Sequence, residues 1–217
     1  MQIKDLYIIG AGGFGREVAW LVERINEVEP TWNIKGFIDD NEATQGTKQG
    51  NYMVVGTCEM LKNIEKEVWV VCAIGSSRVR RIVIDKVSSY DNVRFATVID
   101  PSVMMSSSVR VGEGTIICAG NILTVDITVG NHVIINLDCT VGHDAILEDY
   151  VTLYPSVNVS GCSTLEKEVE VGTGTQIIQG KKILKGTIVG AGAVVTKDLP
   201  ENCTAVGAPA KPIKFRE

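Results

Sequence analysis

The sequence predicts two units of different kinds, an α/β unit with a small parallel sheet and an all-β unit made of stacked short strands. Two observations support this division. Residues 1–95 alternate strand-like apolar runs with segments of helical periodicity, which is the order of a β-α-β fold. Residues 96–217 have no helical period and instead repeat an apolar residue every six positions, which is typical of a solenoid.

The elements of the α/β unit follow from its apolar runs. Strands are expected at 6–10, 33–39, 68–75 and 93–99, and helices at 15–28 and 76–89. The first helix carries apolar residues at helical spacing from Val18 to Ile25, and the second opens with serines that suit a helix N-cap. The run VWVVCAIG at 68–75 is continuously apolar, as expected for a strand that is buried on both faces.

The second unit divides into hexads that start at Val98. In all 17 hexads the second residue is aliphatic, from Ile99 to Val195. Six residues are too few for a strand, a turn and a return, but they suit one flat side of a three-sided coil, with successive coils about 4.8 Å apart. We expect the second column of the hexads to fill the axis of this coil and the third and fourth columns to form its corners. Each unit is then expected to bury a core of its own.

Composition excludes several classes of protein. Hydrophobic residues make up 45% of the 217 residues and charged residues 22%, which favours a packed core over disorder. The net charge of -5 argues against nucleic acid as the main partner. The N-terminus enters a strand-like run directly, so no signal peptide and no membrane insertion are expected. The six cysteines show no paired short spacing, so we expect free thiols in a reducing cytoplasm and no metal site.

The segment GAGGFG at 10–15 has the spacing G-x-G-x-x-G between a strand and a helix, as in Rossmann-like domains. Such a loop favours a phosphate group, and NAD, a nucleotide sugar and a mere tight turn all remain open. A unit of 95 residues has room for only one mononucleotide-binding half, which disfavours NAD. Asp39 and Asp40 end the second strand and can hydrogen-bond a ribose or a base, unless they only form a solvated loop.

Four segments carry a resemblance to a known family. The coil, about residues 92–213 with the end GAGAVVTKDLPENCTAVGAPAKPI, resembles the hexapeptide-repeat acyltransferases, which are left-handed parallel β-helices. The motifs IIGAGGFGREVA and FIDD, and the GHD within NLDCTVGHDAILEDYV, are similar to one branch of that family. This branch O-acetylates sialic acid or N-acetylates UDP-linked amino sugars in bacterial glycan synthesis. The general crossover rule alone would predict the opposite hand for the coil.

The resemblance implies acetyl-CoA as co-substrate, a homotrimer that holds it between neighbouring subunits, and a set of binding residues. The residues implied at the sugar-nucleotide site are Gly12, Gly13, Phe14, Asp39, Asp40 and Gly75, with Asn136 orienting the acceptor. Those implied at acetyl-CoA are Thr152, Gly161, Thr173 and Ala191. Thr152 stands where many relatives have a second histidine, so a mechanism with two histidines is not expected here.

His143 is the candidate catalytic residue. It lies in the fourth column of its hexad, so we expect it at a corner and pointing outward. Acetyl transfer from a thioester needs a base that is neutral near pH 7, which suits imidazole, and Asp144 would orient the ring. The alternative is a polar corner residue without a role. His132 matches no family position and is expected at the surface.

Gly161 follows His143 by three hexads and is therefore expected one coil further along the same corner. Its backbone N–H is positioned to stabilise the charge that builds on a thioester oxygen, although a turn glycine without that role is the alternative. No cysteine or serine is expected to pair with His143, so we expect direct transfer without a covalent intermediate and without a metal.

Two other functions remain open at this point. One is an acyltransferase of the same coil class with a non-sugar acceptor such as serine, which the front unit disfavours. The other is a non-catalytic trimer that binds a sugar nucleotide or acts as a scaffold, which the intact His143–Asp144 pair disfavours. The sequence does not distinguish O-acetylation from N-acetylation.

Overall fold

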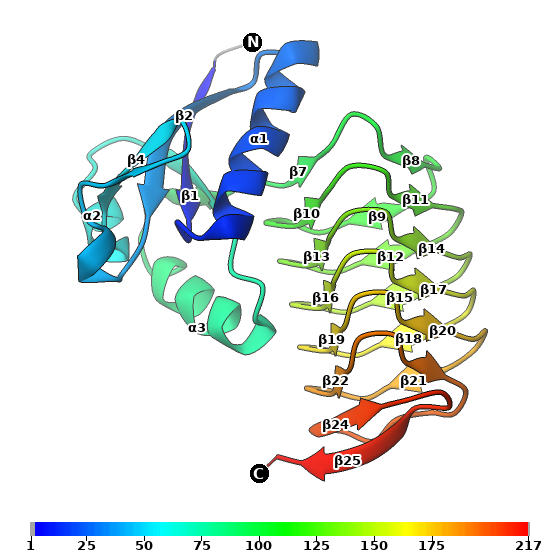
Figure 1. Cartoon of the computed structure of the whole chain (residues 1–217). Helices are drawn as coiled ribbons and strands as arrows, with labels where there is room; N and C mark the ends of the chain where they lie inside the picture. Colours follow the sequence, from blue (N-terminus) through cyan, green and yellow to red (C-terminus); the bar gives the residue numbers. More distant parts are fainter. Residues whose placement is uncertain (1–2, 217) are drawn as a thin grey trace.

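The computed structural model describes residues 3–216, which form an α/β unit followed by a left-handed parallel β-helix (Figure 1). The predicted fold class is confirmed. In the view of Figure 1 the α/β unit lies to the left of the coil, with helices α1 and α3 between its sheet and the coil strands. No helix within the described residues is both long and apolar enough to cross a membrane.

The α/β unit is built on a six-stranded sheet in the order β3-β4-β2-β1-β5-β6. Neighbouring strands are parallel, except for the antiparallel pair β3–β4. The strands are β1 (Lys4–Ile9), β2 (Trp32–Ile38), β3 (Lys48–Gln49), β4 (Tyr52–Gly56), β5 (Val68–Cys72) and β6 (Val93–Phe95). The helices are α1 (Gly13–Val28), α2 (Cys58–Lys62) and α3 (Ser77–Val87), with a 3-10 turn at Glu42–Thr44. The β3–β4 hairpin and α2 lie outside the predicted elements, because residues 40–66 show no clear period.

The segment 93–99, expected as one strand, is divided between the two units. Residues 93–95 form β6 of the front sheet, whereas Val98–Ile99 form β7, the first strand of the coil. Ala96 still donates its N–H to Val70 O, but Val98 donates to Thr115 O one coil further along. The chain therefore passes from one sheet to another within a single apolar run, which periodicity alone does not reveal.

The coil consists of three sheets in which each strand from β7 to β24 pairs in parallel with the equivalent strand of the next coil, as Ile134 does with Thr152, and β25 closes one sheet as an antiparallel neighbour of β24. Strands β7 to β23 have two residues each and are followed by the longer strands β24 and β25. They lie at Val98–Ile99, Met104–Met105, Arg110–Val111, Ile116–Ile117, Ile122–Leu123, Thr128–Val129, Ile134–Ile135, Thr140–Val141, Ile146–Leu147, Thr152–Leu153, Asn158–Val159, Thr164–Leu165, Glu170–Val171, Gln176–Ile177, Lys182–Ile183, Ile188–Val189, Val194–Val195, Cys203–Val206 and Lys211–Phe215.

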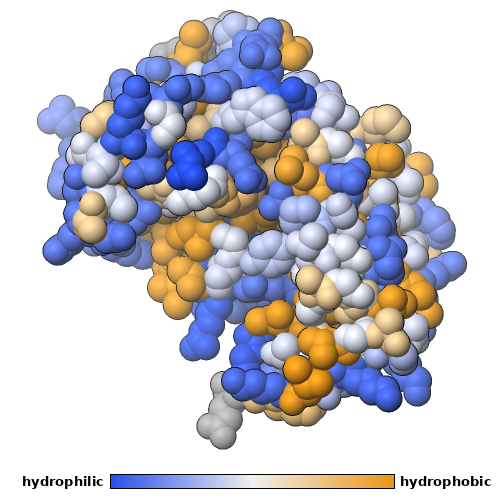
Figure 2. Space-filling view, viewed as in Figure 1, coloured by the Kyte–Doolittle hydropathy of each residue, from blue (hydrophilic) through white to orange (hydrophobic). Residues whose placement is uncertain are grey.

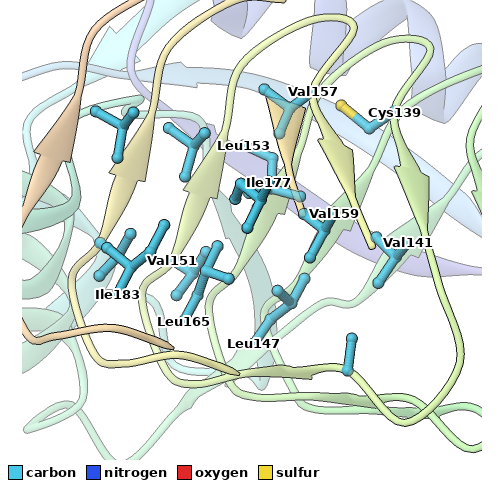
Figure 3. Packing of buried hydrophobic residues seen from close by; sticks show 14 of the residues in the cluster. Cys139, Val141, Leu147, Val151, Leu153, Val157, Val159, Leu165, Ile177 and Ile183 are labelled. Carbon is cyan, nitrogen blue, oxygen red and sulfur yellow. The ribbon is translucent and has the colours of Figure 1, made fainter. Parts of the chain in front are cut away.

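The second column of the hexads fills the axis of the coil, as predicted, from Ile117 onward. Leu147, Leu153, Leu165 and Ile177 are at most 1% exposed, and Figure 3 shows them converging between the three sheets. The first coil differs, because Met105 is 43% exposed. No earlier coil within the described residues covers its side of the axis.

The corners of the coil lie one residue later than expected. The turns occupy the fourth and fifth columns of the hexads, and from Gly114 to Gly192 the fifth column adopts a left-handed backbone. Glycine fills this position in some coils, as at Gly174 with a φ of 71°, but Asp126, Asp144 and Cys162 adopt it too, with φ of 55°, 58° and 58°. The sequence conceals this rule because the position accepts glycine and several polar side chains.

Each unit buries an apolar cluster of its own, as expected, and a third cluster is shared between them. One apolar cluster joins Leu6, Val18 and Val71 of the front unit to Ile116 and Ile134 of the coil. At the end of α1, the buried carboxylate of Asp100 accepts two hydrogen bonds from the Arg24 guanidinium, at 2.6 and 3.0 Å. The part of this coil face formed by β7, β10, β13 and β16 is therefore an internal surface of the molecule.

Arg80 of α3 is the polar centre of this junction. Its side chain is fully enclosed at 1% exposure, and burial lowers the pKa of its guanidinium to about 10. The guanidinium donates to the carbonyls of Ile74, Gly75, His132 and Tyr150 at 2.7–3.0 Å, and to Thr152 Oγ1 at 2.9 Å. It therefore ties the loop after β5 to two successive coils.

We expect Arg80→Ala to lower the free energy of unfolding by about 3 kcal/mol or more, because it leaves several buried carbonyl oxygens without a donor. Arg78→Ala, on the exposed side of the same helix, should change it by no more than about 0.5 kcal/mol. Urea unfolding of the two variants tests this. Equal stabilities for the two would contradict the role of Arg80.

Candidate functional site

The glycine loop at the start of α1 is held in a fixed shape. A Cβ on Gly15 would lie 2.0 Å from Gly10 O, and Gly10 itself has a φ of 101°, so both positions require glycine. Gly12 and Gly13 are exposed at the N-terminus of α1, and a Cβ on Gly12 would meet no atom within 4 Å. Open space beside free N–H groups at a helix N-terminus is the geometry that suits a phosphate.

Asp39 and Asp40 both have internal partners in the structure. Asp39 Oδ2 accepts the N–H of Ala11 at 2.9 Å and so braces the glycine loop, while Oδ1 accepts that of Asn41. Asp40 Oδ1 accepts the N–H of Cys58 at 2.8 Å. These two carboxylates shape the carboxyl edge of the sheet, and any contact they make with a nucleotide comes in addition to these bonds.

The other expected residues of this edge lie at the junction with the coil. Phe14 is half-buried against the shared core. The Gly75 carbonyl accepts from Arg80 and from Thr152 Oγ1, and a Cβ on Gly75 would lie 3.4 Å from the Tyr154 hydroxyl. Gly75 therefore links the carboxyl edge of the sheet to the coil.

His143 lies at an exposed corner, in the turn between β14 and β15, as expected. Its Nδ1 is 2.8 Å from Asp144 Oδ2. When Nδ1 carries the proton and donates to this carboxylate, Nε2 keeps its lone pair and is free to accept a proton. The left-handed backbone of Asp144 brings its carboxylate back beside the preceding ring.

Gly161 lies directly against the free nitrogen of this ring. A Cβ on Gly161 would be 2.6 Å from His143 Nε2, so any other residue would displace the imidazole. Among the hydrogen bonds formed within residues 3–216, the Gly161 N–H has no acceptor. A donor without a partner and a proton acceptor thus lie side by side at one corner.

A thiol also lies at this corner, although the sequence led us to expect no cysteine placed to pair with His143. Cys162 Sγ and ligand atoms of His143 and Asp144 all lie within 4.8 Å of one another. Cys162 follows Asp144 by three hexads, and its N–H donates to His143 O at 2.8 Å. The stacking of successive coils therefore places Cys162 beside His143. The spacing between cysteines in the sequence does not reveal this position.

Thr152 is placed differently from what the resemblance implied. It is 1% exposed, its hydroxyl donates to Gly75 O, and it accepts from Arg80. It faces the front unit and is a structural part of the junction, so contact with acetyl-CoA is not supported. Asn136 is half-buried at another corner, where its Oδ1 accepts the N–H of Leu137 at 2.7 Å.

Thr173 and Ala191 are exposed and stacked on one corner, where Gly192 donates its N–H to Thr173 O at 2.8 Å. This corner joins the face that packs on the front unit to the face that contains β14, and Asn136 lies on it as well. The His143 corner joins the β14 face to the face that contains β15. It is therefore the edge of the prism opposite the front unit, as the positions of β14 and β15 in Figure 1 indicate.

His132 is buried, which corrects the expectation of a surface residue. It is 5% exposed, its ring stacks on Tyr150 at 5.3 Å between centroids, and the edge of Phe95 approaches it at 4.7 Å. Burial, with a smaller effect from the Arg80 charge, lowers the pKa of His132 to about 4. His132 is thus a neutral component of the junction between the units.

Comparison with known proteins agrees with both units. Residues 5–87 match the PglD N-terminal domain family. The structure is similar over its whole length to the acetyltransferase domain of PglB from Neisseria gonorrhoeae FA1090, with 29% identity, a TM-score of 0.88, and coverage of 97% of this chain and 100% of that one. It is also similar to PerB from Caulobacter crescentus, solved with CoA and GDP-perosamine, with 31% identity, a TM-score of 0.85, and coverage of 98% and 99%.

The chain belongs to the hexapeptide-repeat sugar acetyltransferases.

WeeI from Acinetobacter baumannii AYE gives a similar match, with 31% identity, a TM-score of 0.87, and coverage of 97% of this chain and 100% of that one. Among curated relatives, a putative acetyltransferase of Schizosaccharomyces pombe is 37% identical over 91 residues, or 41% of this chain. The chain spans about two fifths of the length of that relative (42%), and about a third of the next two. These local matches therefore concern only part of each protein.

The sequence did not reveal where three residues of this acetyltransferase lie, namely Arg80, Cys162 and His132. Arg80 reads as one cation of a basic helix, and only its position on the inner face of α3 distinguishes it from Arg78 and Arg81. Cys162 and the buried His132 are both in the fifth column of their hexads. The spacing of three hexads already stacks Cys162 on Asp144, but only the structure shows that their column lies in the turn beside His143.

We expect acid to destabilise the protein partly through His132. Its pKa is about 4 in the folded chain, compared with about 6.5 for a free imidazole, so between these values only the unfolded chain binds the proton. This contribution to stability is fully present above about pH 6.5 and is lost as the pH falls towards 4, with a slope of at most about 1.4 kcal/mol per pH unit. Urea unfolding from pH 7.5 to 4.5 should show a shallower dependence for His132→Phe. Parallel curves would refute the burial effect.

Proposed function

We propose that this protein transfers the acetyl group of acetyl-CoA to a nucleotide-linked amino sugar, with His143 as the general base. The observation that carries the proposal is the corner where His143, oriented by Asp144, presents Nε2 to the backbone of Gly161. The relatives support both substrates, since PglB was solved with acetyl coenzyme A and PerB with CoA and GDP-perosamine. Acetyl-CoA then serves as a co-substrate, and the reaction takes place in the cytoplasm.

The chemistry follows from the two groups at the corner. His143 Nε2 accepts a proton from the amine of the acceptor as its nitrogen attacks the carbonyl carbon of the thioester. Asp144 stabilises the imidazolium that forms, and the Gly161 N–H donates to the oxygen on which negative charge builds. The C–S bond then breaks, and the His143 imidazolium gives its proton to the departing sulfur, so CoA leaves as the thiol and the base is neutral again. No acyl-enzyme is required, although Cys162 lies nearby.

The front unit (1–95) is the acceptor-binding part in this proposal, and the coil (96–217) is the part that binds acetyl-CoA. Gly12 and Gly13 at the N-terminus of α1 offer free N–H groups to the diphosphate of the sugar nucleotide. Gly75 and the aspartates Asp39 and Asp40 form the edge around it. Thr173 and Ala191, on the corner next to the front unit, contact acetyl-CoA.

This assignment requires more than one copy of the chain. The glycine loop belongs to the front unit, and the Thr173 corner borders the coil face that packs on this unit. His143 lies on the opposite edge of the coil. An acceptor bound by one front unit therefore meets the His143 of a neighbouring copy. Exposed apolar side chains on the coil, among them Met104, Ile122 and Val125, provide a surface for such a neighbour, and Figure 2 shows apolar surface over this unit. Three copies close such a head-to-tail contact into a ring.

The identity of the acceptor is tested by CoA release with a panel of UDP-linked and GDP-linked amino sugars and sialic acid. We expect turnover with a nucleotide-linked amino sugar and an amide product. Turnover with sialic acid alone would replace this proposal by O-acetylation. A protein that binds acetyl-CoA and UDP without turnover on any acceptor would instead be the scaffold that the sequence left open.

We expect His143→Ala to lower kcat by at least about 10², the usual contribution of a general base, with little change in the affinity for acetyl-CoA. Asp126→Asn, one coil earlier on the same corner, is the matched control and should retain activity. Steady-state assays of CoA release and calorimetry with acetyl-CoA measure the two effects. A kcat within a few-fold of the parent would exclude His143 as the base.

We expect two impaired variants to complement each other when they are co-expressed and assayed at a sugar-nucleotide concentration well below the raised KM. Gly12→Asp adds a negative charge where phosphate would bind without a steric clash, so the KM for the sugar nucleotide should rise at least about 10-fold, whereas Gly12→Ala should change little. In mixed assemblies of Gly12→Asp and His143→Ala chains, about a quarter of the sites combine an intact loop with an intact histidine, provided that they lie on different copies. Activity recovered to about that level supports the shared site. No recovery, with mixing shown by mass spectrometry, would place the whole site within one chain.

A further inference from the structure

The corner with His143 carries a third side chain of metal-binding type that the proposed reaction does not use. Ligand atoms of His143, Asp144 and Cys162 lie within 4.8 Å of one another, and all three side chains are exposed. Asp144 and Cys162 occupy the same position in successive coils, with φ of 58° in both. The hydrogen bond of 2.8 Å from Cys162 N to His143 O fixes the two turns relative to each other.

The chemistry of this set is selective. A thiolate, an imidazole and a carboxylate are the three ligand types that zinc binds, at about 2.0–2.3 Å in tetrahedral geometry. Ligand atoms around such an ion lie about 3–4 Å apart. Here His143 Nδ1 and Asp144 Oδ2 are 2.8 Å apart, and one ligand atom from each of the three residues lies within 4.8 Å of the other two, which is close to that spacing. Magnesium and calcium prefer oxygen ligands and fit this set poorly.

We propose that His143, Asp144 and Cys162 form a zinc site with a water as fourth ligand, and that zinc bound there stops acetyl transfer. The inhibition rests on the proposed role of His143, whereas the metal site itself does not. A neutral imidazole has one lone pair and one N–H. If zinc takes the lone pair at Nε2, the base is occupied. If it takes Nδ1, the proton must lie on Nε2, which then cannot accept another.

The binding arm of the test uses the full-length protein and ZnCl₂, with a chromophoric chelator as competitor. We expect one zinc per chain in the parent protein and an affinity at least about 10-fold lower in Cys162→Ser. The control is Asp126→Asn, whose side chain occupies the same column one coil earlier and lies outside the cluster, and it should bind zinc like the parent. Cobalt in place of zinc should give a thiolate-to-metal charge-transfer band that Cys162→Ser lacks.

The activity arm measures CoA release with and without zinc, followed by EDTA. Zinc should inhibit the parent and Asp126→Asn reversibly, and Cys162→Ser should keep turning over at zinc concentrations that stop the parent. Equal zinc affinity in parent and Cys162→Ser, or no binding at all, would overturn the metal site. Zinc binding that requires Cys162 but leaves turnover unchanged would overturn the inhibition and would count against His143 as the base.

Discussion

The enclosed guanidinium of Arg80 is the interaction on which the arrangement of the two units depends. Six acceptors from the loop after β5 and from the coil converge on it, and it remains charged because those oxygens replace water. Around it the apolar side chains of the front sheet, α1 and the coil form one continuous cluster. The carboxyl edge of the sheet is therefore fixed in height and orientation against a particular set of coils.

The sequence predicted the coil well because one physical rule repeats in it. Each hexad must place one side chain on the axis. A shift of one residue would turn that side chain towards solvent. The aliphatic pattern from Ile117 to Val195 therefore allows only one register of the hexads along the coil. The front helices and strands follow in the same way from their periods. His143, Asp144 and Gly161 were brought together by counting three hexads to each coil, and in the structure they lie at one corner.

The parts that could not be predicted depend on contacts between segments with different periods. Nothing in the pattern around Thr152 shows that its face of the coil is covered by α3, so a hydroxyl expected at the cofactor lies instead in the junction. His132 illustrates the same limit, because a polar residue in a turn column normally faces solvent. Here Phe95 and Tyr150 enclose it, from a strand of the other unit and from the next coil.

The left-handed position that recurs along the corners of the coil separates architecture from chemistry. Along one edge the same backbone slot holds Asp126, Asp144, Cys162 and Gly180 in successive coils, all with positive φ, while the axis beneath them stays aliphatic. A substitution in such a slot changes the reactive groups on the edge without altering the shape of the coil. Acids, thiols and glycines can thus replace one another in single coils. The edge of the β-helix can change its chemistry while the aliphatic axis and the backbone stay the same.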